Sequence, residues 1–153
     1  MREKMDLAAL MPTIEEVISA GGVFRLYPRG ISMLPLLHEG TDSVELAAAN
    51  EYAVGDVLLY RRANGQFVLH RLIAVERNTL TFCGDNQGSL EYDVPKSAVL
   101  AKMCGYFAGE EHRSLDTPEY RRYARERVRR FPFYRRNERL LAFLRKVKHT
   151  IIK

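Results

Sequence analysis

Three polar residues along this chain, Ser32, His70 and Asp85, are of the types that together hydrolyse a carbonyl compound through a covalent intermediate. A serine hydroxyl is a poor nucleophile until a neighbouring base takes its proton, and an imidazole can do this near neutral pH. A carboxylate holds the imidazole in the right tautomer and stabilises the imidazolium that forms. Because each of the three lies beside a predicted turn or strand end, together they predict a serine hydrolase.

Ser32 follows a glycine by two positions and precedes an apolar run that ends at a proline, a pattern typical of a tight turn. In such a turn the backbone N–H of Ser32 is free to donate a hydrogen bond to a developing oxyanion. We therefore expect Ser32 to supply both the nucleophile and one oxyanion donor. We expect Gly30, Ile31 and Met33 to line the oxyanion and substrate-binding site around it.

The candidate base, His70, lies in an apolar segment and shares a face with Val68 and Leu72 if that segment is a strand. The candidate carboxylates, Asp85 and Asp93, lie in the polar stretch that follows the next apolar segment. A histidine on a buried face and an aspartate at a strand exit are both common in purely structural roles. Chain order alone does not identify a triad, because geometry does.

The segments that hold these residues are predicted strands, because apolar and polar residues alternate in them or form short apolar runs. Asn64-Gly65 predicts a hairpin turn, and the absence of strand–helix–strand alternation argues against a parallel sheet. Thr13 and Glu16 form a capping-box pattern that predicts a short helix ending at Gly21. The predicted fold is mainly β (α+β), a compact antiparallel sheet with a short N-terminal helix. The predicted strands cover residues 23–27, 43–46, 57–60, 67–75, 79–82 and 98–107.

Charge divides the chain into an acidic body and a basic C-terminal segment. Residues 1–116 hold 11 Lys and Arg against 16 Asp and Glu, whereas residues 117–153 hold 13 against 3. We expect residues 1–116 to form the β domain and residues 117–153 a helical appendage, with Thr117 as its N-cap and Pro118 in its first turn. Apolar side chains among arginines let such an appendage lie on an anionic membrane, although they can instead pack on the sheet. The residues expected to contact the membrane are Arg135, Arg136, Leu140 and Leu144.

Composition limits the possible cofactors and locations. The 153 residues are 46% hydrophobic and 28% charged, which suits one folded domain and excludes a disordered chain. Two cysteines and four scattered histidines give neither a disulfide framework nor a zinc-binding pattern, so we expect no metal and no cofactor. No uncharged stretch exceeds nine residues, so no membrane-spanning helix is expected. The expected location is the cytoplasm or the surface of its membrane.

Four short motifs resemble, in the same order, those of signal peptidases and the related LexA-like autopeptidases. Residues 30–35 (GISMLP) resemble the nucleophile motif, and residues 54–60 (VGDVLLY) resemble the strand that follows it. Residues 69–72 (LHRL) resemble the base motif, and residues 82–86 (FCGDN) resemble the acidic motif. Each motif is short, but the four occur in register across the predicted sheet. The resemblance implies a peptidase domain of coiled antiparallel sheets.

The superfamily divides by its catalytic base. Most members use a lysine, whereas archaeal and endoplasmic-reticulum signal peptidase subunits use a histidine assisted by an aspartate. This chain has no lysine between Lys4 and Lys96, so it resembles the histidine type. The resemblance implies a serine endopeptidase that cleaves an extended peptide, with Ser32 as the nucleophile and His70 as the general base.

The supporting acid is less well defined by the resemblance, which places it in or shortly after the acidic motif. Asp85 is the first choice and Asp93 the second, whereas Glu91 lies nearer the usual spacing for the second acid. The membrane anchor and the additional exterior domain of typical signal peptidases have no counterpart in this sequence. The resemblance is therefore to a minimal, soluble member of the histidine type.

Two other functions compete with this one. A LexA-like regulator that cleaves itself would need a susceptible bond such as Ala20–Gly21, only twelve residues before Ser32. A non-catalytic peptide-binding module on the same fold is the second alternative. For the endopeptidase the expected partner is a peptide or protein substrate, bound as an added strand near residues 27–31. Nucleic acid is disfavoured, because the arginines of the C-terminal segment lack a base-reading motif.

Overall fold

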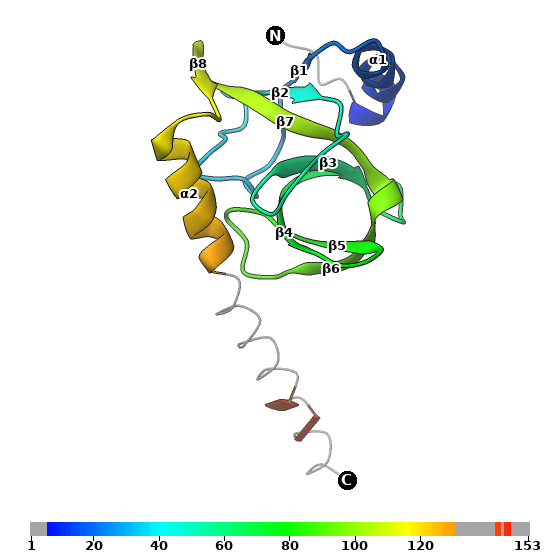
Figure 1. Ribbon diagram of the computed structural model, residues 1–153, viewed down its shortest axis with the longest axis vertical. Coiled ribbons are helices and arrows are strands. Elements are labelled where there is room, and N and C mark those ends of the chain that lie inside the picture. The colour runs from blue at the N-terminus through cyan, green and yellow to red at the C-terminus, as the bar shows by residue number, and fades with distance from the viewer. Residues whose placement is uncertain (1–5, 131–142, 145, 148–153) are drawn as a thin grey trace.

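The described residues form an antiparallel sheet of eight strands, with helix α1 before it and helix α2 after it (Figure 1). The computed structural model describes residues 6–130, 143–144 and 146–147. The helices are α1 (Leu7–Ser19), the 3-10 helix η1 (Lys96–Ala98) and α2 (Pro118–Arg129). The strands are β1 (Phe24–Leu26), β2 (Ser43–Ala47), β3 (Val57–Arg61), β4 (Phe67–Val75), β5 (Thr79–Cys83), β6 (Glu91–Pro95), β7 (Val99–Ala108) and β8 (Glu111–Ser114).

The strand order is β1-β2-β7-β3-β4-β5-β6, and β8 also pairs with β7. Each of these pairs is antiparallel, which confirms the prediction of a mainly β, antiparallel fold. Figure 1 shows β3 to β6 curling around one another, while β1, β2 and helix α1 lie at the other end. Helix α2 runs along the side of the molecule near β4.

The sheet separates two hydrophobic cores, and β3 contributes to both. Val57 and Leu59 face the first core, which α1, β1 and β2 cover, whereas Leu58 and Tyr60 face the second core between β3 and β6. All four side chains are buried, with at most 1% of their surface exposed. A strand that is buried on both faces has no polar face, so it appears in the sequence as a continuous apolar run.

The predicted hairpin is confirmed. β3 and β4 pair around Asn64-Gly65, with Arg62 N donating to Gln66 O at 2.8 Å and Gly65 at φ +87°. Glycine populates that left-handed region without a steric penalty. The resulting register places Leu58 opposite His70, so Tyr60 lies diagonally from His70 on the same face of the sheet.

The predicted start of the first helix is wrong. Helix α1 begins at Leu7, and the side chain of Asp6 caps it by accepting a hydrogen bond from Ala8 N at 3.2 Å, so Thr13 lies inside the helix. Met11 and Ile14 are buried and three positions apart, so the apolar face of the helix starts before the capping-box pattern does. Packing of this face outweighed the local capping signal.

The predicted start of the C-terminal helix is confirmed. Thr117 is the N-cap of α2 and its Oγ1 accepts from Tyr120 N at 3.2 Å, with a proline in the first turn. Three of the residues expected to contact a membrane, Arg135, Arg136 and Leu140, lie outside the described residues. The fourth, Leu144, is helical and 51% exposed. No helix in the described part of the chain is long and apolar enough to cross a membrane.

Candidate active site

The turn that carries Ser32 is held against the loop after β5. Asn86 N donates to Ser32 O at 2.8 Å, and Asn86 Nδ2 donates to Ile31 O at 3.1 Å. Met33 anchors the turn from the other side, because its side chain is buried in the first core. Two sequence motifs that lie more than fifty residues apart, the GISMLP and FCGDN segments, are therefore in direct contact.

Gly84 brings the two segments this close together. A Cβ built on Gly84 would lie 2.7 Å from Ser32 O and 2.9 Å from Gln87 Oε1, closer than real Cβ contacts. The missing side chain thus leaves the space that the Ser32 carbonyl occupies. Ile31, which precedes Ser32, is 66% exposed. Gly30 has φ +84°, a conformation that residues with a side chain rarely adopt.

We expect Gly84→Ala to destabilise the fold by about 1–3 kcal/mol, the usual cost of inserting a methyl group where there is no room. Because the clash involves the Ser32 backbone, we also expect it to lower any hydrolysis that Ser32 carries out. Gly22→Ala is a matched control, since its Cβ would meet Val17 O at 2.9 Å, away from Ser32. Urea denaturation and a cleavage assay of both variants separate the two effects. Equal cleavage by the two variants would argue against a catalytic role for the Ser32 turn.

His70 lies in β4 near the same place. The β4–β5 pairing joins Arg71 to Cys83 and Leu72 to Phe82, and it ends at Cys83, the residue before Gly84. The Ser32 backbone therefore lies against Gly84, one residue beyond the end of the pairing that joins β5 to Arg71, the neighbour of His70. Within the described part of the chain no hydrogen bond joins the Ser32 hydroxyl to the His70 ring. Catalytic hydrogen bonds are often long in the absence of substrate and tighten in the Michaelis complex.

His70 is buried and faces polar groups of β3 and β6. Only 4% of its surface is exposed, and its Nδ1 lies 3.4 Å from the Tyr60 hydroxyl. Tyr60 in turn donates to Glu91 Oε1 at 2.8 Å. Burial, followed by the positive charge of Arg62, lowers the pKa of His70 to about 4, although Glu91 and Asp85 act in the opposite direction. His70 is thus neutral at physiological pH, the state in which an imidazole can accept a proton.

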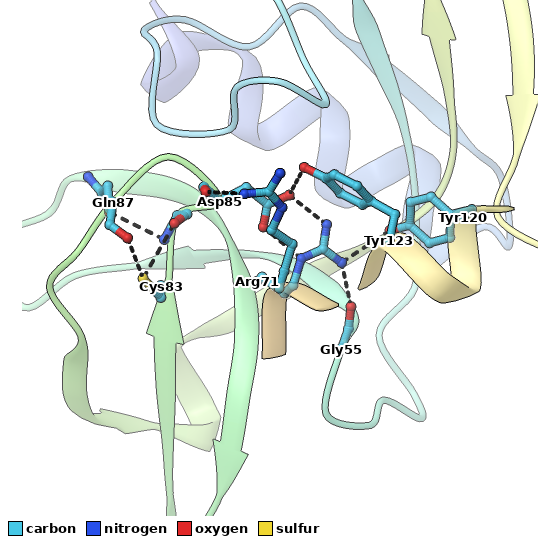
Figure 2. A network of polar contacts seen from close by, with 9 residues as sticks. Gly55, Arg71, Cys83, Asp85, Gln87, Tyr120 and Tyr123 are labelled. Carbon is cyan, nitrogen blue, oxygen red and sulfur yellow. Dashed lines mark hydrogen bonds and ion pairs between the residues drawn. The ribbon is translucent and has the colours of Figure 1, made fainter. Parts of the chain in front are cut away.

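Asp85 forms a buried ion pair with Arg71 (Figure 2). Arg71 Nε and one terminal nitrogen donate to the two oxygens of Asp85 at 2.7 and 2.8 Å. The other terminal nitrogen donates to Gly55 O at 2.7 Å. Tyr123 of α2 adds a hydrogen bond to Asp85 Oδ2 at 2.8 Å, and the ring of Tyr120 lies beside the Arg71 guanidinium. Asp85 therefore pairs with Arg71 and helix α2, and the carboxylate linked by hydrogen bonds to His70 is Glu91.

The electrostatics of this buried cluster favour the charged pair. Burial alone would lower the pKa of Arg71, but the hydrogen bonds and charge of Asp85 outweigh burial and raise it. Burial and then the charge of Asp85 raise the pKa of Tyr123, so its hydroxyl remains a donor. Arg127 Nη1 also donates to the backbone oxygen of Asp85 at 3.3 Å. The loop that contacts Ser32 is therefore fixed from behind by α2.

Asp93, the second predicted acid, lies in β6 with an exposed side chain and φ 58°. Sequence reasoning had weighed Glu91 by its spacing but had missed Tyr60, which connects Glu91 to His70. The signal for Tyr60 was the Asn64-Gly65 hairpin, whose register places Tyr60 and His70 on one face. No cluster of His, Cys, Asp or Glu within the described residues could hold a metal ion.

Models of known protein families, curated proteins and solved structures were compared with this chain, and none matches it. The chemistry open to the site follows from its own residues. These residues are a half-buried serine on a turn held by Asn86, a buried neutral histidine, and a carboxylate linked to that histidine through Tyr60.

Proposed function

We propose that this protein is a serine endopeptidase of the histidine type, similar in its chemistry to a signal peptidase. Ser32 is the nucleophile and His70 is the general base. The observation that carries the proposal is the close approach of the Ser32 carbonyl to Gly84, the residue that follows the partner of Arg71 and so lies near the end of β4 that holds His70. The nucleophile motif, the GD strand, the base motif and the acidic motif also meet in one place, through hydrogen bonds among Ser32, Gly55, Arg71 and Asp85 or their immediate neighbours.

In the proposed reaction Ser32 Oγ attacks the carbonyl carbon of the scissile peptide bond and its proton passes to His70. The carbonyl oxygen becomes an oxyanion, towards which the Ser32 backbone N–H can donate. When the intermediate collapses, the C–N bond breaks and His70 returns the proton to the leaving amine. Water then attacks the acyl-enzyme with His70 again as base, which releases the carboxylic acid and restores Ser32.

The surface beside Ser32 favours an extended peptide as the substrate. Strand β1 lies at the end of the strand order and pairs only with β2 among the described strands, so its other edge can accept a peptide as an additional strand. Val23, Tyr27 and Ile31 are 53%, 38% and 66% exposed along the segment from β1 to the nucleophile turn. Apolar side chains of a bound peptide would contact this segment.

The test is cleavage of a diverse peptide mixture by the full-length protein, followed by mass spectrometry. We expect defined internal cleavage products that disappear with Ser32→Ala, because alanine has no nucleophilic oxygen. Ser97→Ala, which alters an exposed serine of η1, is the control and should cleave normally. If Ser32→Ala cleaves the peptides as fast as the unmodified protein, Ser32 is not the nucleophile and the proposal is wrong.

The same experiment tests self-cleavage at Ala20–Gly21, since it also records the mass of the protein. Ala20 is the C-cap of α1, with its N–H donating to Glu16 O at 3.1 Å, and Gly21 N donates to Ile18 O at 3.0 Å. This bond would have to leave the helix end before it could reach Ser32. Cleavage of other peptides is therefore the favoured reading, and a fragment ending at Ala20 would support self-cleavage.

A further inference from the structure

A chain of polar groups lies behind His70, on the side of its Nδ1 atom. Tyr60 of β3 lies 3.4 Å from that nitrogen and donates to Glu91, the first residue of β6, at 2.8 Å. Arg62 Nε contacts both oxygens of Glu91, at 2.9 and 3.0 Å. Phe82 of β5 pairs with Glu91, so four neighbouring strands place these groups on one face. The chain therefore runs His70, Tyr60, Glu91, Arg62.

The hydrogen-bonding capacity of each group fixes the direction of the protons. Glu91 is paired with the guanidinium of Arg62, so it is an ionised carboxylate and can only accept. The short contact between Tyr60 and Glu91 therefore requires that the Tyr60 O–H donates to the carboxylate. The phenol oxygen then has only lone pairs to offer His70, so Nδ1 of His70 must carry the hydrogen. A neutral imidazole with hydrogen on Nδ1 has its free lone pair on Nε2.

We propose that Tyr60 and Glu91 are positioning residues for His70: they hold the ring in the Nδ1–H tautomer and leave Nε2 free to take the Ser32 proton. This inference rests on the proposed function, and it replaces the expected aspartate with a glutamate that acts through a tyrosine. Without Tyr60 and Glu91, the imidazole would favour the opposite tautomer or populate both, as it does in water. Only a fraction of the molecules would then have an unprotonated Nε2.

The surroundings make this chain rigid. Tyr60 is fully buried, and its ring stacks on Phe82 with centroids 4.1 Å apart and planes 17° apart. Burial and then the hydrogen bond and charge of Glu91 raise the pKa of Tyr60, so the hydroxyl keeps its proton. The charged groups that act on His70 are Arg62, Glu91 and Asp85, and the partners of Asp85 lie on β4 and α2. Of the two acids, Glu91 alone has a hydrogen-bonded path to the ring among the described residues, and Arg62 joins that path through Glu91.

The first experiment observes the tautomer directly and needs no activity. Ser32→Ala protein labelled with ¹⁵N at histidine is examined near pH 7, and the four histidines are assigned by comparison with a variant that also carries His70→Gln. We expect His70 to show a protonated, pyrrole-type Nδ1 and an unprotonated, pyridine-type Nε2. Tyr60→Phe should remove this preference, and Tyr52→Phe, a half-buried tyrosine packed on the same core, should not. If His70 carries its hydrogen on Nε2 in the Ser32→Ala protein that retains Tyr60 and Glu91, the inference is overturned.

The second experiment measures cleavage. Tyr60→Phe and Glu91→Gln are expected to lower kcat about ten- to a hundredfold with little change in KM, since general base catalysis contributes about 10²- to 10⁴-fold and the base remains present. Glu91→Asp, which keeps the charge, should recover part of the loss, and Tyr52→Phe should cleave normally. An unchanged kcat in both Tyr60→Phe and Glu91→Gln would contradict the inference. The failure of Ser32→Ala to abolish cleavage would instead contradict the proposed function, and the tautomer measurement tells these outcomes apart.

Discussion

Asp85→Ala is expected to lower the free energy of unfolding by about 3–5 kcal/mol, the usual result of removing one partner from a buried ion pair. Arg71 has no exposed surface, and alanine at position 85 would leave its guanidinium with Gly55 O and the Tyr120 hydroxyl as its hydrogen-bond acceptors. The charge could neither reach water nor lose its proton at ordinary pH. The Tyr123 hydroxyl would lose its acceptor in the same change. Urea denaturation followed by circular dichroism measures the loss.

Two further variants separate the buried charge from other causes of instability. Arg71→Met combined with Asp85→Leu removes both charges and should recover most of the stability, because well-packed apolar side chains can replace a buried pair. Glu111→Ala removes an exposed partner of Arg113 at 3.0 Å and should change stability by less than about 1 kcal/mol. If Asp85→Ala proves as mild as Glu111→Ala, the buried pair does not hold this region together.

The same ion pair connects stability to the candidate site. Asp85 precedes Asn86, whose backbone and side chain hold the Ser32 turn, and Arg127 and Tyr123 of α2 hold Asp85 from the other side. Helix α2 thus supports the Ser32 turn through one loop. We would expect the Asp85→Ala protein to lose ordering of the loop before it loses the sheet, since loops with few buried contacts open most easily.

The strands that the sequence predicted were those with a strong pattern of their own. The apolar run of β3, the Asn64-Gly65 turn and the long β4 were correct because local turn chemistry and burial agree there. Strand β6 was not predicted, because Glu91, Tyr92, Asp93 and Pro95 form no apolar pattern and Val94 alone is buried. Strand β6 exists because β5 offers it a partner. Pairing of this kind depends on tertiary structure and leaves little trace in a short segment.

In the candidate site, too, features with a local sequence signal were predicted and features that depend on strand pairing were not. Ser32 and His70 could be selected by residue type and setting, and the structure places the Ser32 backbone beside Gly84, just beyond the end of the β4–β5 pairing. The partner of each carboxylate could not be predicted from the sequence. Asp85 lies on the face of the sheet that holds Arg71, whereas Glu91 lies on the face that holds His70. Arg71 and His70 are adjacent in β4 and their side chains point to opposite faces of the sheet. Arg71 therefore binds Asp85, whereas His70 is linked through Tyr60 to Glu91. The registers of the β3–β4, β4–β5 and β5–β6 pairs determine which acid lies beside which residue.

As the pH falls, the protein is expected to lose stability at a higher pH than protonation of its carboxylates alone would cause, because His70 is buried in its neutral form. The pKa of His70 is about 4 in the folded protein and about 6.5 in an unfolded chain, so between these values the unfolded chain binds the proton and the folded protein does not. The stabilisation is therefore complete above about pH 6.5 and is lost progressively as the pH falls towards 4. Since one pKa unit corresponds to about 1.4 kcal/mol, the loss is about 3 kcal/mol over this range.

Comparison with His70→Gln isolates this contribution, because glutamine does not titrate. The difference in unfolding free energy between the two proteins, measured by urea denaturation at pH 7, 5.5 and 4, should shrink by about 3 kcal/mol across the series. Asp42 does not account for that change: backbone N–H groups of Gly109 and His38 outweigh its burial and lower its pKa, so its effect belongs to more acid conditions and is shared by both proteins. A difference that stays constant from pH 7 to pH 4 would mean that folding does not lower the His70 pKa. A difference that shrinks as expected would establish that the ring is neutral where the proposed reaction needs it, with a lone pair available to accept the Ser32 proton.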